Sequence, residues 1–167
     1  MRKLLFFLIF LPAFFASCSH KNTGREAVLK TINQAFLDST IKNSDSFYVK
    51  KYKRPDFVTA EYYVFRKDSA LTQVMRDSAK QVRQVITTKK NVRTYFAQYY
   101  PNGQLIADLS FDPYGQYHGP ALYYNMNGSI KSSGKYNHGL STGTWQEFDD
   151  AGVVTKLKYD TNGVRIP

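Results

Sequence analysis

The sequence predicts a mainly β protein, an elongated antiparallel meander of repeated β-hairpins with one helix near the N-terminus. Aromatic residues make up 16% of its 167 residues, with 13 tyrosines and 12 phenylalanines, and such side chains favour the half-buried surface of a pleated sheet. Signals for chain reversal recur about every 24 residues through the C-terminal half. Because 43% of the residues are hydrophobic and 22% charged, wholesale disorder is excluded. We therefore expect one folded body built by repetition.

The first residues have the organisation of an export signal. Arg2 and Lys3 precede an apolar run over 4–16 that is interrupted by Pro12. This run is too short to cross a bilayer, which takes about 20 residues, but it has the length of a signal-peptide core. We therefore assign 1–17 to a signal peptide.

Cys18 is the only cysteine of the chain and follows this signal directly. The small residues Ala16 and Ser17 before it resemble the lipobox of bacterial lipoproteins, which implies that the Cys18 thiol carries lipid such as palmitate. The alternative is a plain signal peptide with an incidental unpaired thiol. Because more than one acyl chain makes attachment durable, we expect a membrane protein anchored by lipid in a bacterial cell envelope and facing the periplasm.

The charge balance is basic. The formal net charge is +10, and removal of Arg2 and Lys3 leaves 21 basic against 13 acidic residues, or +8. In the cytoplasm such a balance favours nucleic-acid binding. For an exported chain the expected partners are anionic lipid headgroups, cell-wall polymers or an acidic protein, and no nucleic acid.

A polar tether is expected over 18–24, followed by a helix and a basic linker over 25–56. Thr23 and Glu26 have the spacing of a capping box. Apolar residues then follow at helical spacing, at Val28, Leu29, Ile32, Ala35 and Phe36. These features predict a helix over about 25–38.

The segment 44–55 interleaves tyrosines with cations. Tyr48 and Tyr52 alternate with Lys50, Lys51, Lys53 and Arg54. Close to a lipid anchor, these cations would favour an anionic surface by about 1 kcal/mol each. The alternative, which we favour, is a solvated loop or an edge strand whose lysines discourage aggregation.

Residues 57–93 are expected to form a β region with a degenerate first repeat. The segment 57–65, FVTAEYYVF, is a strand by composition, whereas the apolar residues of 71–88 have helical spacing. An internal comparison favours strands there, because a shift of 72 residues places Thr144, Asp149, Ala151 and Val154 on Thr72, Asp77, Ala79 and Val82. Lys80 and Asn91 then stand where later copies have glycine, and asparagine tolerates positive φ.

Clearer repeats occupy 94–167. Two copies have identical intervals, one with Gly119, Ala121, Tyr124 and Gly128 and the other with Gly143, Trp145, Phe148 and Gly152. Residues two apart in a strand share a face, and glycine enters left-handed turns without a Cβ clash, so each copy predicts a β-hairpin. The expected turn glycines are Gly103, Gly115, Gly119, Gly128, Gly139, Gly143, Gly152 and Gly163.

Two runs in this region, NGQLIADLSFDPYGQYHGPALYYNMNG and GSIKSSGKYNHGLSTGTWQEFDDAG, resemble MORN repeats (membrane occupation and recognition nexus). The resemblance is to the bacterial variant found in proteins labelled YwqK-family antitoxins, and it covers about 94–163. It implies a single elongated, curved antiparallel sheet that is used for recognition or scaffolding.

No catalytic residue, metal ligand or cofactor site is predicted. The three histidines lack the spacing of zinc ligands. His20 lies in the expected tether, whereas His118 and His138 directly precede glycines and are expected to line turns. The carboxylates Asp108, Asp112, Asp149, Asp150 and Asp160 lie mostly in or beside turns, where Asp caps backbone donors. A glycosidase would need two carboxylates facing each other across a cleft.

An aromatic face of the sheet is the predicted binding surface. Its candidate contacts to an envelope protein or glycan are Tyr123, Tyr136, Trp145 and Tyr159; the alternative is that these rings form the small core. We therefore predict a membrane-anchored, non-catalytic binding or scaffolding module. The alternatives are an antitoxin or immunity-type inhibitor with a toxin partner, and an enzyme that acts on cell-wall glycans.

Overall fold

The computed structural model describes residues 34–54 and 57–167. The expected signal peptide, Cys18, the tether and the first part of the expected helix lie outside these residues. Among those described, no helix has the length and apolar character needed to span a bilayer.

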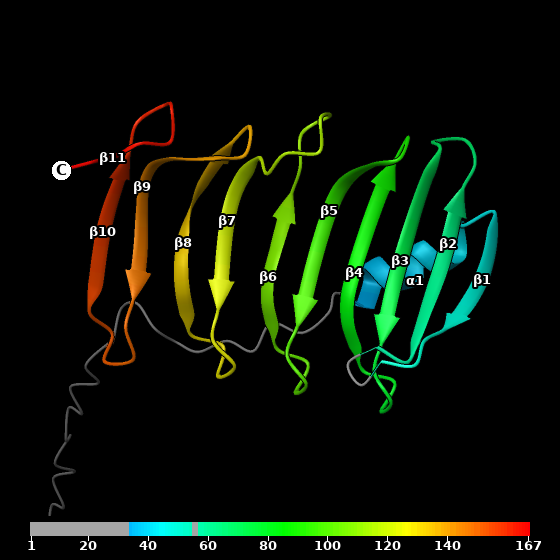
Figure 1. The fold of residues 1–167 in the computed structure, drawn as a ribbon. Coiled ribbons are helices and arrows are strands. Elements are labelled where there is room, and N and C mark those ends of the chain that lie inside the picture. The colour runs from blue at the N-terminus through cyan, green and yellow to red at the C-terminus, as the bar shows by residue number, and fades with distance from the viewer. Residues whose placement is uncertain (1–33, 55–56) are drawn as a thin grey trace, which may run out of the picture.

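Eleven strands form one antiparallel sheet in which every strand pairs with its neighbours in the sequence (Figure 1). The strands are β1 (Ser46–Lys51), β2 (Thr59–Phe65), β3 (Ala70–Arg76), β4 (Val82–Lys89), β5 (Val92–Tyr99), β6 (Leu105–Ser110), β7 (Gly119–Tyr124), β8 (Ile130–Asn137), β9 (Leu140–Phe148), β10 (Val154–Tyr159) and β11 (Arg165–Ile166). One helix, α1 (Gln34–Asn43), lies across one face of the N-terminal strands. The predicted fold class, a mainly β antiparallel meander with one short N-terminal helix, is confirmed.

The helix ends at Asn43 and not near 38 as expected. Leu37 and Thr40 face the sheet and are buried, whereas Ala35 and Phe36, which were expected on the apolar side, are exposed. The helical spacing of sheet-facing side chains therefore continues one turn further than the sequence pattern indicated. Beyond it the Ser44 hydroxyl donates to the Ile41 carbonyl at 3.1 Å and satisfies an end group of the last turn.

Residues 71–88 form strands, as the internal comparison predicted. Val74 and Val85 are directly paired and buried on the helix side of the sheet, whereas Met75 and Ile86 alternate with them and point to the other side. Because both sides carry apolar residues, the alternation of a half-buried strand is blurred and the local spacing resembles that of a helix.

The basic segment contains an edge strand, which is one of the two forms that we favoured for it. β1 pairs with β2 on one side and closes one edge of the sheet. The rings of Tyr48 and Tyr62 stack with centroids 4.7 Å apart, and the Lys50 ammonium lies over the Tyr62 ring. This stacking gives the edge strand side-chain contacts on the sheet, while its lysines stay in solvent.

Turns of one kind recur at one end of the strands. In the loops after β3, β5, β7 and β9, the N–H of the fourth residue donates to the carbonyl of the first at 2.9–3.1 Å. That fourth residue has positive φ in every copy: Lys80, Gly103, Gly128 and Gly152. At the opposite end Asn91, Gly115, Gly139 and Gly163 also have positive φ, as do Gly119 and Gly143. The chain therefore alternates between two sets of turns, one at each end of the strands. Within each set the turns follow one another at intervals of about 24 residues.

Each face of the sheet carries its own apolar cluster. On the face that α1 covers, the helix face, the buried cluster is Leu37, Tyr63, Val74, Val82, Val85, Ala97, Tyr99, Leu105 and Tyr124. On the opposite face, the far face, it is Ala107, Leu109, Ala121 and Trp145 with partly buried aromatics around them. The two clusters are offset along the sheet, so that α1 covers the first and side chains of neighbouring strands cover the second.

Candidate functional site

Aromatic rings form a continuous row on the far face of the C-terminal strands. The row runs from Phe111 through Tyr117 and Tyr136 to Trp145, with successive ring centroids 4.9, 5.2 and 4.9 Å apart. The Tyr123 hydroxyl lies 3.3 Å from that of Tyr136. Phe111 and Tyr117 belong to the connection between β6 and β7, and Tyr136 and Trp145 belong to β8 and β9. Each connection thus places two rings beside those of the next, which is how a one-layer sheet buries aromatic surface.

The four predicted binding residues belong to this cluster. Trp145 is 7% exposed, and Tyr123, Tyr136 and Tyr159 pack partly buried against the cluster. Burial, followed by the hydrogen bond with Tyr136, raises the pKa of Tyr123. These rings therefore hold the sheet together and present only part of their surface to solvent.

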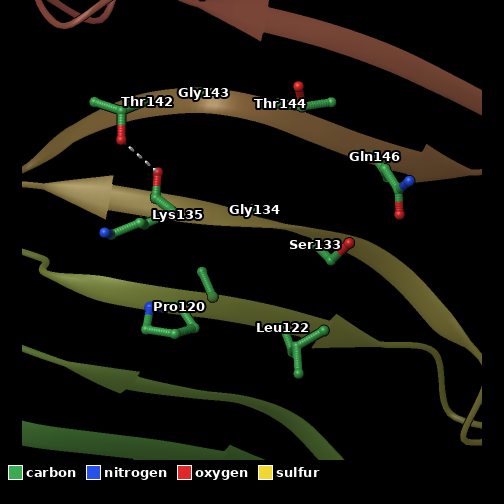
Figure 2. A pocket seen from close by; sticks show the side chains of 10 residues that line it. Pro120, Leu122, Ser133, Gly134, Lys135, Thr142, Gly143, Thr144 and Gln146 are labelled. Carbon is green, nitrogen blue, oxygen red and sulfur yellow. Dashed lines mark hydrogen bonds between the residues drawn. The ribbon is translucent and has the colours of Figure 1, made fainter.

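A shallow open trough lies on the helix face, over β7, β8 and β9 and away from α1 (Figure 2). It encloses about 560 Å³. The residues that line it are small or polar for the most part: Pro120, Ala121, Leu122, Ser133, Gly134, Lys135, Thr142, Gly143, Thr144 and Gln146. None of these ten side chains is acidic, and none is a histidine or a cysteine.

The register of β10 adds two further lysines beside the trough. Lys158 pairs with Thr144, and Lys156 pairs with Gln146. Because directly paired residues share a face, both lysines lie on the same side of the sheet as Lys135, and all three are exposed. The trough therefore combines positive charge with hydroxyl and amide groups, which suits binding of an anionic group.

Sequence reasoning did not identify this trough. The available signal was the alternation of polar residues, at Thr142, Thr144 and Gln146 in one strand and at Lys156 and Lys158 in the next. Such alternation is typical of any solvated face. Only the pairing register of β9 and β10 shows that the polar residues of the two strands lie side by side.

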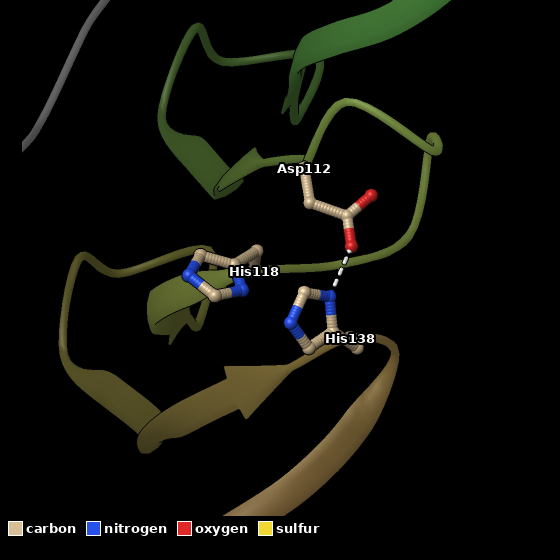
Figure 3. Close-up of side chains that lie close together, drawn as sticks. All are labelled: Asp112, His118 and His138. Carbon is tan, nitrogen blue, oxygen red and sulfur yellow. Dashed lines mark hydrogen bonds and ion pairs between the residues drawn. The ribbon is translucent and has the colours of Figure 1, made fainter.

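A second group of polar residues lies at one end of the strands (Figure 3). Asp112 and His118 belong to the loop between β6 and β7, and His138 belongs to the turn between β8 and β9. Asp112 Oδ2 is 2.7 Å from His138 Nδ1, and the two imidazole centroids are 5.2 Å apart. We call these three residues the histidine cluster.

Asp112 is held firmly at the base of this cluster. Its Oδ1 accepts the backbone N–H groups of Tyr114 and Gln116, both at 2.9 Å. Burial of the carboxyl opposes its ionisation, but the hydrogen bonds from Gln116, His138 and Tyr114 outweigh burial and lower the pKa of Asp112. The carboxylate is therefore charged and fixed in direction.

Comparisons with known proteins add no identification. No protein-family model matches the sequence, and no curated protein matches it. A crystal structure of a mutant of TarM from S. aureus, in complex with fondaparinux, α-GlcNAc-glycerol and UDP, is similar at a TM-score of 0.36 and 7% sequence identity. The match covers 68% of this chain and only 24% of that one, and a likeness this weak supports no conclusion about fold or function.

Proposed function

We propose that this chain is a lipid-anchored, non-catalytic binding module of a bacterial envelope, and that it binds an anionic envelope glycan along the trough over β7, β8 and β9. The observation that carries the proposal is the grouping of Lys135, Lys156 and Lys158 beside a trough with no acidic lining residue. The lipobox-like residues before Cys18 support the anchor.

The shape of the trough favours an extended polymer over a small molecule. Small ligands are generally held in pockets that surround most of their surface, whereas this trough is open to solvent. A polymer gains affinity by repeating weak contacts, and the Thr144 hydroxyl can donate to its oxygens. Contacts between exposed charges are screened by salt, so binding should weaken as ionic strength rises.

The trough is a better binding surface than the aromatic row. Trp145 and its partly buried neighbours already contact one another, so a partner gains little new burial there. Within 34–54 and 57–167 the helix leaves the trough side chains uncovered, because α1 lies over the N-terminal strands (Figure 1).

Binding to purified anionic wall polymer tests the proposal, with a neutral glucan as the reference. Replacing Lys135, Lys156 and Lys158 together by Gln should weaken binding about tenfold, since exposed ion contacts contribute roughly 0.5 kcal/mol each. The matched control replaces Lys42, Lys67 and Lys90, which are equally exposed but lie away from the trough. Equal losses in both triple variants would show that only net charge matters, and the trough assignment would then be wrong. Shortening of the polymer during incubation would instead favour an enzyme.

The anchor is tested separately by fractionation. Cys18→Ala should move the protein from the membrane to the soluble fraction, while Ser19→Ala should leave it in the membrane. Retention of the Cys18→Ala protein in the membrane would refute lipid anchoring.

A further inference from the structure

We propose that Asp112, His118 and His138 form a binding site for one divalent transition-metal ion of the Zn²⁺ class. Each residue offers one nitrogen or oxygen atom, and these three atoms lie within 4.8 Å of one another. Figure 3 shows the two imidazoles side by side, with the Asp112 carboxylate next to His138.

A simple hydrogen-bonded pair does not account for the cluster. The contact between Asp112 and His138 satisfies one oxygen and one nitrogen. The Nδ1 atom of His118 is buried and has no hydrogen-bond partner among the described residues. A buried polar atom without a partner costs about 1–3 kcal/mol, and a metal ion that accepts the lone pair of this nitrogen would remove that cost.

The geometry is close to that of a bound ion and needs one side chain to move. Zn²⁺ holds nitrogen at about 2.0–2.1 Å and carboxylate oxygen at about 2.0–2.2 Å in a tetrahedron, which places ligand atoms about 3.3 Å apart. Asp112 is fixed by two backbone N–H groups. The His138 side chain is 55% exposed, so its imidazole has room to exchange the contact with Asp112 for an ion held between the three residues.

The donor set selects the kind of metal. Two imidazoles and one carboxylate suit Zn²⁺, Cu²⁺ or Ni²⁺, whereas Mg²⁺ and Ca²⁺ require oxygen ligands. Three protein ligands leave a fourth position open on the solvent side, next to the exposed His138.

The ion would join two separate loops. The loop between β6 and β7 already contacts the turn between β8 and β9, because the Gly139 N–H donates to the Tyr117 carbonyl at 2.8 Å. Asp112 and His118 stand on the first of these segments and His138 on the second. Metal binding therefore links successive hairpins and should raise the melting temperature of the protein.

The test is Zn²⁺ binding by isothermal titration calorimetry, using full-length protein with a tag free of histidine. We expect one Zn²⁺ per chain and a higher melting temperature with Zn²⁺ but not with Mg²⁺. Cu²⁺ bound at the same site should show electron paramagnetic resonance couplings from two imidazole nitrogens.

Three substitutions remove one ligand each with little change of structure. Asp112→Asn keeps the oxygen that accepts the turn N–H groups. His118→Phe keeps a planar ring beside His138. His138→Asn suits a left-handed residue, since His138 has φ 46°. Each variant should weaken Zn²⁺ binding at least about tenfold and keep the melting temperature of the metal-free protein.

His20→Ala and Cys18→Ser are the controls, because these residues are the other histidine and the only thiol. Both should retain Zn²⁺ binding. Absence of Zn²⁺ binding at millimolar concentration would overturn the proposal. Binding that persists in His118→Phe and His138→Asn, or that disappears in either control, would overturn it as well.

Discussion

The indole of Trp145 lies directly on Gly134 of the adjacent strand. A Cβ atom added at Gly134 would come within 2.1 Å of Trp145 Cδ2 and 2.3 Å of Cε2, far inside van der Waals contact. Gly134 does not have positive φ, so close approach and not backbone conformation requires glycine here. The missing side chain makes room for the largest buried ring of the far face.

Gly134→Ala should therefore destabilise the protein by about 1–3 kcal/mol, the usual cost of overpacking. The added methyl group must displace the indole, which is wedged against the Tyr136 ring with centroids 4.9 Å apart. Urea denaturation followed by Trp145 fluorescence measures the loss. Ser132→Ala, on the same strand and face, is the control and should change stability by less than about 0.5 kcal/mol. Equal stability of the two variants would contradict the packing described.

Leu37→Ala should cost about 2–5 kcal/mol, because it removes a buried side chain from the contact between α1 and the sheet. Ile41→Ala is a matched control in the same helix, since Ile41 is 51% exposed. Its cost should be below about 1 kcal/mol. Thermal unfolding of both variants is monitored by far-ultraviolet circular dichroism. Equal melting temperatures of the two variants would contradict the packing of α1 against the sheet through Leu37.

Lys80→Gly should stabilise the protein by about 0.5–1 kcal/mol. Lys80 has φ 62°, a left-handed conformation that strains any residue with a Cβ, and glycine relieves that strain at some cost in chain entropy. The Lys80 N–H bond to the Asp77 carbonyl involves backbone alone and is kept. Lys67→Gly, in an exposed loop without positive φ, should not stabilise. A loss of stability in Lys80→Gly would show that the lysine side chain contributes more than the strain costs.

Stability should fall as the pH rises from about 10 to about 12. Burial, followed by the nearby Glu61 carboxylate, raises the pKa of Tyr63 to about 12, compared with about 10 in an unfolded chain. Between these values the folded state holds a proton that the unfolded state has lost, so the contribution is complete below pH 10 and disappears through pH 12. Tyr63→Phe should show a smaller loss over this interval in urea titrations. Tyr114→Phe, at an 82% exposed position, should follow the unmodified protein.

The architecture was predictable from the sequence because turn chemistry is local. Lys80 and Asn91 could be aligned with later glycines, and both have the positive φ that this alignment implied. The internal comparison also outweighed the helical spacing of 71–88, which arises because both faces of β3 and β4 carry apolar residues.

Contacts between different strands were less predictable. The end of α1 depends on where Leu37 and Thr40 meet the sheet, and β1 depends on pairing with β2 across a loop. The role of Gly134 is set by Trp145 on another strand. Likewise His118 and His138 occupy non-equivalent repeat positions, and they meet only because the long loop before β7 reaches the turn after β8. Such relationships follow from register, which sequence spacing alone does not provide.

Pairing only between sequence neighbours makes the sheet extensible. Insertion or deletion of one whole period adds or removes two strands, about 10 Å of sheet width, and leaves every other backbone pairing intact. The number of hairpins therefore determines the width of the surface that the protein presents, independently of which side chains that surface carries.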